Sequence, residues 1–141
     1  MRDKSTDDLQ EELMHASSID SYIHGNKGLF TNPKIPTLLA EIYEKKSISK
    51  AVLARRAGMS EVYLHQVFAG RRNPSRDRLL CLCVGLEVSL DEAQKLLKQA
   101  AYAPLYPKNR RDAIITYGIL HHMQLQAIND KLFLENEKTL S

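Results

Sequence analysis

The chain has 141 residues, of which 43% are hydrophobic and 26% are charged, and its formal net charge is +3. This length and composition are typical of a soluble protein with one domain, or one domain and an appendage. No apolar run approaches the roughly 20 residues of a membrane-spanning helix, and the charged N-terminus lacks the apolar stretch of a secretory signal. We therefore expect a cytoplasmic protein without a membrane contact.

The first 32 residues are predicted to form an acidic helical arm, and residues 1–30 contain six acidic and three basic side chains. Residues 5–16 can form a helix. Its apolar side consists of Leu9, Leu13 and Met14. Two prolines within residues 32–36 separate the arm (residues 1–32) from the rest of the chain. Whether the arm packs on the following domain stays open.

Residues 48–75 have the pattern of two short helices joined at a sharp angle. Ser49 can cap the first helix, and Gly58 can end it because glycine tolerates the positive φ that helix C-termini commonly need. Ser60 can cap the second helix, of about residues 60–69. Its inward stripe is expected to consist of Leu64, Val67 and Phe68.

Three further helices are expected around this pair. A helix over about residues 36–46 precedes it, and a nearly all-apolar helix over residues 76–86 follows. Ser89 and Glu92 form a capping box that opens the fifth helix. The two cysteines, Cys81 and Cys83, lie in the apolar helix and would point to different sides. They are therefore predicted to be buried free thiols rather than a disulfide or a metal site.

The positive charge is concentrated on the same part of the chain. Residues 45–78 contain nine Lys and Arg side chains and two acidic ones. An ordinary solvated surface would not collect its positive charge in one segment, whereas a surface that contacts nucleic acid would. This segment is therefore a candidate for phosphate contact.

The segment resembles the helix-turn-helix of the XRE (phage-repressor-like) family of DNA-binding transcriptional regulators. The residues that carry the resemblance are Ala54, Gly58, Ser60, Gly70, Asn73, Pro74, Ser75, Leu79, Leu80, Leu86, Val88 and Ser89. The resemblance implies an all-α fold with a five-helix repressor-like core over residues 33–103. It also implies sequence-specific binding to double-stranded DNA, with the helix at about 60–69 in the major groove.

The resemblance places the base-reading positions on Glu61, Val62, His65 and Gln66. Gln66 can pair with adenine through both atoms of its amide, His65 can bond a purine N7, and Val62 can meet a thymine methyl. Glu61 departs from the Gln or Arg often found at its position. Its carboxylate can accept from cytosine N4 but repels phosphate, so it favours either selectivity or the absence of DNA binding.

The phosphate-binding residues are expected to be Ser49, Lys50, Ser60, Arg71, Arg72 and Asn73. The turn after Gly70 offers cations and backbone N–H groups to a phosphate. The alternative is that this turn merely connects two helices. Such a connection needs Gly, Asn and Pro but not two arginines, so we favour phosphate contact.

Residues 104–141 are predicted to add a pair of helices, from Arg110 to about His121 and from about Gln124 to Asn136. Their apolar side chains at helical spacing are Ile114, Ile115, Ile119, Leu120, Leu125, Ile128, Leu132 and Phe133. A free-standing surface helix would not carry so many. The set must therefore be buried on the core, on a second copy of the chain in a homodimer, or on a partner protein.

The sequence shows no set of residues that would support catalysis. His121 and His122 are adjacent, so on a helix they point about 100° apart and lack further ligands at metal-binding spacing. No phosphate-binding glycine loop, nucleophile elbow or metalloprotease signature occurs. We therefore expect no enzyme activity, no cofactor and no metal. The alternative to a DNA-binding regulator is a protein-interaction module that keeps the fold and binds DNA weakly or not at all.

Overall fold

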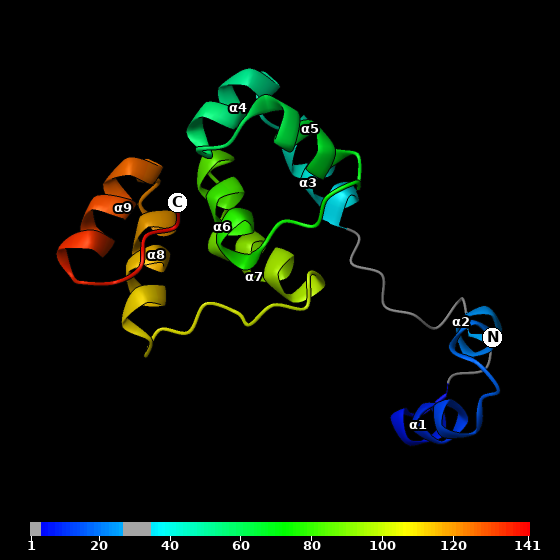
Figure 1. Ribbon diagram of the computed structural model, residues 1–141. Helices are drawn as coiled ribbons and strands as arrows, with labels where there is room; N and C mark the ends of the chain where they lie inside the picture. Colours follow the sequence, from blue (N-terminus) through cyan, green and yellow to red (C-terminus); the bar gives the residue numbers. More distant parts are fainter. Residues whose placement is uncertain (1–3, 27–34) are drawn as a thin grey trace. The chain divides into compact units, whose positions relative to one another are not determined.

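The computed structural model describes residues 4–26 and 35–141, and all regular secondary structure in these ranges is helical (Figure 1). This confirms the all-α class that the sequence predicts. The chain divides into two compact units, Met1–Asn32 and Pro33–Ser141. Among the described helices, none has the length and apolar character that a membrane span requires.

The first unit contains α1 (Thr6–His15) and α2 (Ile19–Gly25), which are joined by a polar cluster. Lys4 Nζ donates to Glu12 Oε1 and to Asn26 Oδ1, each over 2.7 Å, and Asn26 Nδ2 donates to Glu12 Oε2. The hydrogen bond from Lys4, followed by that from Asn26, holds the pKa of Glu12 below its usual range. The large apolar side chains exposed on this unit are Leu13, Met14, Ile19 and Ile23.

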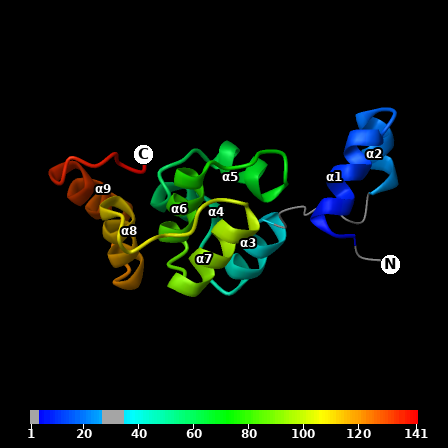
Figure 2. The same cartoon turned by 90° about the horizontal axis from the view of Figure 1, so that it is seen from below.

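The described part of the second unit has seven helices. They are α3 (Ile35–Glu44), α4 (Lys50–Arg56), α5 (Glu61–Phe68), α6 (Arg76–Gly85), α7 (Leu90–Gln99), α8 (Arg110–Leu120) and α9 (Leu125–Leu134). Figures 1 and 2 show α8 and α9 side by side, and both helices contact α6. The same helix contacts α4 and α7, so α6 is the centre of the unit.

Helix α6 is the most buried element, as its nearly all-apolar sequence predicts. Every residue from Leu79 to Gly85 is buried. Cys81 and Cys83 belong to this run and are free thiols. Burial raises the pKa of Cys81 to about 11 and that of Cys83 to about 12, so both thiols stay protonated near neutral pH. Protonated, buried thiols are unreactive and act as small apolar side chains.

The ends of α4 and α5 form as their sequences predict. Ser49 accepts a hydrogen bond from the Val52 N–H, and Ser60 accepts one from the Tyr63 N–H, each over 3.1 Å. Gly58 follows α4 with φ +65°, and Gly70 follows α5 with φ +75°. Other side chains lose about 1 kcal/mol in this left-handed region, which is why glycine suits both sharp turns.

The C-terminal helices pack on each other and on the rest of the unit. Gly118 of α8 makes the close approach possible, because a Cβ there would lie 2.4 Å from Ile128 Cδ1 of α9. The apolar side chains that the pair buries are Ile115, Ile119, Leu125, Ile128 and Leu132. By contrast, Leu120 is 56% exposed and Phe133 is 75% exposed, although the sequence groups both with the apolar set. Each directly follows a buried residue and so points about 100° away from it.

Candidate nucleic-acid interface

The orientation of α5 is set by its buried side. Leu64 and Val67 are 0% and 1% exposed, and α5 contacts both α3 and α4. Burial of residues three apart on one side leaves the opposite side of the helix at the surface. Val62 is 68% exposed on that opposite side. The helix therefore presents its outer face in a fixed orientation.

Three of the predicted base-reading residues lie on this outer face. Glu61, Val62 and His65 are exposed, whereas Gln66 is half-buried. His65 Nε2 lies 3.9 Å from Glu61 Oε1, one helical turn away. The structure thus brings the four residues together over one turn and a half of α5. The Glu61 carboxylate and the His65 imidazole can form hydrogen bonds with a ligand, and Val62 can make an apolar contact.

Gln66 is held by a side chain from the turn that follows the helix. Its Oε1 accepts a hydrogen bond from Arg72 Nε over 2.9 Å. The guanidinium carbon of Arg72 lies 5.8 Å from the ring centre of Tyr63, and that of Arg78 lies 4.8 Å from the same ring. Cations at such distances over an aromatic face are attracted to it. Sequence reasoning missed Tyr63 and Arg78, whose roles depend on the fold of the turn.

Lys50 is positioned by two aromatic rings. Its Nζ lies 4.3 Å from the ring centre of Phe68 and 4.8 Å from that of Tyr43. The two rings pack edge to face with their centres 5.5 Å apart. The ammonium group is therefore held at the start of α4, next to the end of α5. The sequence predicts a phosphate contact for Lys50 but gives no sign of these rings.

The turn after α5 carries Arg71, Arg72 and Asn73, which are all exposed. The backbone N–H groups of Arg71 and Arg72 donate to the Gln66 carbonyl over 2.9 and 3.3 Å. These two N–H groups are used to close the end of the helix. In this part of the turn, the positively charged side chains of the two arginines are therefore the groups available to a phosphate. Tyr102 Oη donates to the Pro74 carbonyl over 2.5 Å and ties the turn to the segment after α7.

The capping serines keep a hydrogen-bonding capacity at the surface. Ser49 and Ser60 are exposed, and the oxygen of each hydroxyl accepts one backbone hydrogen bond within its own helix end. A hydroxyl that accepts in this way still has its own O–H to donate. Both side chains can therefore cap a helix and donate to a phosphate at the same time.

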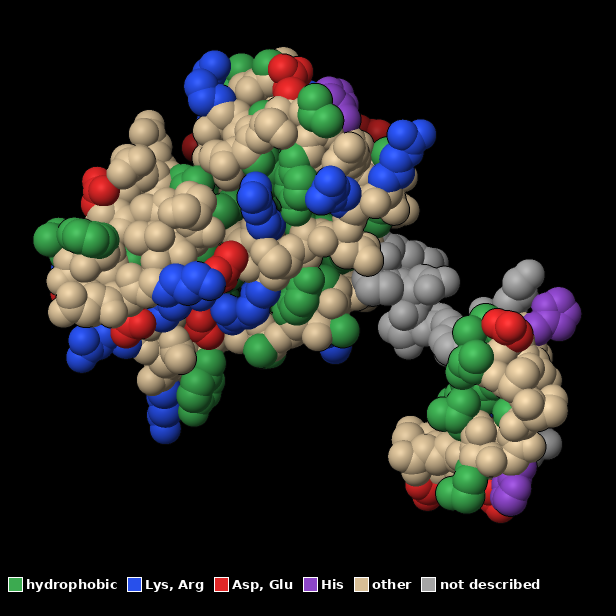
Figure 3. All heavy atoms as spheres, viewed as in Figure 1, with side chains coloured by type: hydrophobic (Ala, Val, Ile, Leu, Met, Phe, Trp, Pro, Cys, Tyr) green, Lys and Arg blue, Asp and Glu red, His purple; other side chains and the backbone are tan. Residues whose placement is uncertain are grey.

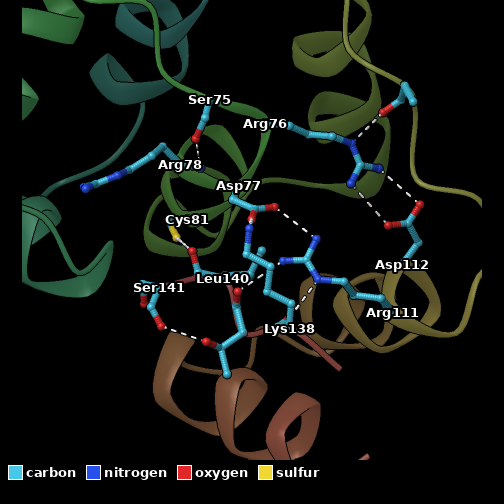
Figure 4. A network of polar contacts seen from close by, with 12 residues as sticks. Ser75, Arg76, Asp77, Arg78, Cys81, Arg111, Asp112, Lys138, Leu140 and Ser141 are labelled. Atoms are coloured by element: carbon cyan, nitrogen blue, oxygen red, sulfur yellow. Dashed lines mark hydrogen bonds and ion pairs between the residues drawn. The ribbon is translucent and has the colours of Figure 1, made fainter. Parts of the chain in front are cut away.

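Arg76 has a structural role, although the sequence counts it with the basic segment. Its Nη1 and Nη2 donate to the two carboxylate oxygens of Asp112 over 3.3 and 3.1 Å. Its Nε donates to the Ala103 carbonyl, and its Nη2 also donates to the Pro104 carbonyl. Figure 4 shows this guanidinium turned toward α8. The positive charge of Arg76 is thus neutralised inside the second unit.

A second arginine fastens the C-terminal tail in the same region. Arg111 Nη1 donates to Asp77 Oδ1 over 3.0 Å, and its other groups donate to the carbonyls of Lys138 and Thr139 (Figure 4). Leu140, which follows them, is 5% exposed. The start of α6 is therefore linked to α8 and to the end of the chain.

The other Lys and Arg side chains of residues 45–78 lie in or near α4, α5 and the turn between α5 and α6. Figure 3 shows Lys and Arg side chains over this part of the second unit, with a histidine near α5. Exposed or half-buried members of this group are Lys45, Lys46, Lys50, Arg55, Arg56, Arg71, Arg72 and Arg78. Within the described residues, no group of three or more His, Cys, Asp or Glu side chains could hold a metal ion.

Comparison with known families supports this description. Residues 37–96 match the model of a family described as a helix-turn-helix domain, and the match extends from α3 into α7. The match agrees with the resemblance to the phage-repressor-like family, covers 60 of the 141 residues and gives no finer family. No curated protein and no solved structure matches the chain.

Proposed function

We propose that the chain binds double-stranded DNA sequence-specifically as a transcriptional regulator, with α5 as the recognition helix. The observation that carries the proposal is the exposed outer face of α5, with Lys50 beside Phe68 at the end of the helix and Arg71 in the turn that follows. A helix fits the major groove, and the residues of its first turns reach the base edges. The proposed function requires binding alone and no catalytic step.

The proposed contacts divide into two groups. Glu61, Val62, His65 and Gln66 face the bases, where hydrogen bonds and methyl contacts discriminate between base pairs. Phosphates are bound by Ser49, Lys50, Ser60, Arg71, Arg72 and Asn73. Such contacts supply affinity and orient the protein, but they carry no sequence information directly.

Removal of the base-reading side chains tests this division. A preferred site is first selected from random duplexes with the full chain. Gln66→Ala and His65→Ala are then expected to lose about 1–3 kcal/mol of binding free energy on that site and little on random DNA. The measurement is a fluorescence titration with both duplexes, and Gln126→Ala on α9 is the control. Equal losses on both duplexes would show that the side chains support the domain and read no base.

We also propose that the DNA-bound form is a homodimer. Regulators with this motif commonly read two half-sites about one helical turn apart, which requires two recognition helices. An apolar groove between α8 and α9, lined by Ile114, Tyr117, Met123 and Leu134 among others, is the proposed contact with the second copy. Leu134 is 73% exposed, so its replacement leaves the core intact.

Sedimentation at micromolar concentration tests the homodimer. The unaltered chain is expected to be dimeric on a palindromic duplex, and Leu134→Ser is expected to shift it toward the monomer. Lys138→Ser, at another exposed position, serves as the control. A chain that stays monomeric both free and on the duplex would rule out the dimer.

A further inference from the structure

We propose that Arg72 is the positioning residue of the base-reading site, where it holds the Gln66 side chain in one orientation. This inference rests on the proposed function of α5 as the recognition helix. An amide side chain has an oxygen that accepts and a nitrogen that donates, so the base that it recognises depends on which atom faces the base edge. A residue that fixes the amide therefore contributes to specificity without touching a base.

The hydrogen bond between the two side chains determines the orientation. Arg72 Nε donates to Gln66 Oε1 over 2.9 Å, which turns the amide oxygen toward the guanidinium. A guanidinium has no acceptor atom, so it cannot bond the amide nitrogen in the same place. The flipped orientation would bring two donors together and is disfavoured. The second lone pair of Oε1 and the NH2 group stay available for a base edge.

The position of Arg72 is itself constrained by the turn. Its backbone N–H donates to the Gln66 carbonyl over 3.3 Å, so backbone and side chain bind the same residue. Its guanidinium lies over the ring of Tyr63, which is half-buried. Attraction between the cation and the ring favours this position of the guanidinium. These contacts exist before any DNA is bound, so the amide is oriented in advance.

The neighbouring arginine provides a matched control. Within the described residues, the side chain of Arg71 makes no hydrogen bond, ion pair or ring contact that would hold Gln66. Arg71 and Arg72 have the same charge, are adjacent in the chain and are both exposed. A purely electrostatic role would make them equivalent. If Arg72 positions Gln66, replacement of Arg72 lowers sequence discrimination and replacement of Arg71 does not.

Replacement of each arginine by lysine separates charge from positioning. Lysine keeps the positive charge but has neither the Nε–H at this position nor the planar guanidinium that lies near the Tyr63 ring. The duplexes are the selected site and its variants in which one base pair at a time is changed, together with random DNA. Affinity is measured at several salt concentrations, and thermal unfolding of each variant shows that its fold is intact.

Arg72→Lys is expected to lower the discrimination at the base pair opposite Gln66 by about tenfold and to leave the other positions unchanged. Its affinity for random DNA and its salt slope are expected to change no more than those of Arg71→Lys, because both variants conserve the charge. Arg71→Lys, at the neighbouring phosphate-binding position, is expected to leave the discrimination at that base pair unchanged. When Gln66 is already replaced by alanine, Arg72→Lys should have no further effect on discrimination. If Arg72 only supported the fold, its replacement would still lower discrimination in that background.

Two results would overturn the inference. One is discrimination that Arg72→Lys leaves intact. The other is a loss of affinity that is equal on all duplexes, which would leave Arg72 with a phosphate-binding or supporting role alone. If either occurs while the unaltered chain retains a preferred site, the proposed function of α5 survives. An unaltered chain without any preferred site would remove both proposals.

Discussion

Leu132→Ala is expected to lower the free energy of unfolding of the second unit by about 3 kcal/mol, within the roughly 2–5 kcal/mol found for buried leucines. Leu132 lies in α9 and is 0% exposed, and α9 contacts α6 and α8. Truncation removes buried apolar surface and leaves a cavity that the packed neighbours cannot fully fill. Denaturant unfolding, followed by circular dichroism, measures the loss.

The adjacent residue is the matched control for this change. Phe133 is 75% exposed, so Phe133→Ala is expected to change the free energy of unfolding by no more than about 0.5 kcal/mol. A similar loss for both variants, or less than about 1 kcal/mol for Leu132→Ala, would contradict the packing of α9 on the core. A large loss for Leu132→Ala and a small one for Phe133→Ala would show that the buried apolar side chains of α9 are covered by the core. The sequence alone leaves open whether the core, a second copy of the chain or a partner covers them.

Asp112→Asn is expected to lower the free energy of unfolding by about 2 kcal/mol. Asp112 is 7% exposed and accepts hydrogen bonds from Arg76 and from the Tyr106 N–H. The variant leaves the Arg76 guanidinium in a partly buried place without a counter-charge. Loss of one partner costs about 3–5 kcal/mol for a fully buried pair. The cost is smaller here because the Arg76 side chain is 21% exposed.

An exposed ion pair on α9 gives the control for Asp112→Asn. The side chains of Lys131 and Glu135 are 55% and 40% exposed, and their charged atoms are 3.2 Å apart. Such surface pairs contribute about 0–1 kcal/mol, so Glu135→Gln is expected to have almost no effect on unfolding. Equal midpoints for Asp112→Asn and Glu135→Gln in thermal unfolding would show that the Arg76 pair does not fasten α8 to α6.

Helix starts could be predicted from the sequence because their chemistry is local. Ser75 caps α6 and Ser89 caps α7 through a hydrogen bond to a backbone N–H three residues ahead, as their positions indicate. The Glu92 side chain completes the predicted capping box at Ser89. Side chain and partner lie within one turn of the same helix, so no knowledge of the tertiary fold is needed.

Several helix ends could not be predicted in the same way. Four helices are followed by a non-glycine residue in the left-handed region, namely Glu87, Ala101, His122 and Asn136. Their sequences lack the glycine that marks Gly58 and Gly70. At Glu87, tertiary packing compensates for the strain, since the next residue is Val88, which is 0% exposed. Burial of an apolar residue just after the left-handed position commonly accompanies such an ending.

The contacts around the candidate site could not be predicted from local sequence patterns either. The inward stripe of α5 predicts that Glu61, Val62, His65 and Gln66 face outward. The first three are exposed, whereas Gln66 is half-buried. The bond between Arg72 and Gln66 depends on how the turn after α5 folds back, and Lys50 meets a ring from α3. Arg76 and Asp112 are 36 residues apart, so a count along the chain assigned Arg76 to the basic segment, while the fold pairs it with a carboxylate.

The central claim, that α5 and the surrounding cations bind DNA of a particular sequence, is tested most directly by a salt titration on two duplexes. The duplex selected from random sequences and a scrambled duplex of equal length are titrated with the full chain between low and physiological salt. We expect the selected duplex to bind at least about 10³-fold more tightly. For both duplexes, log K should fall linearly with log salt, by about 0.9 for each phosphate neutralised. A chain that enriches no duplex, or whose binding does not respond to salt, would contradict the claim and favour a protein-interaction module on the same fold.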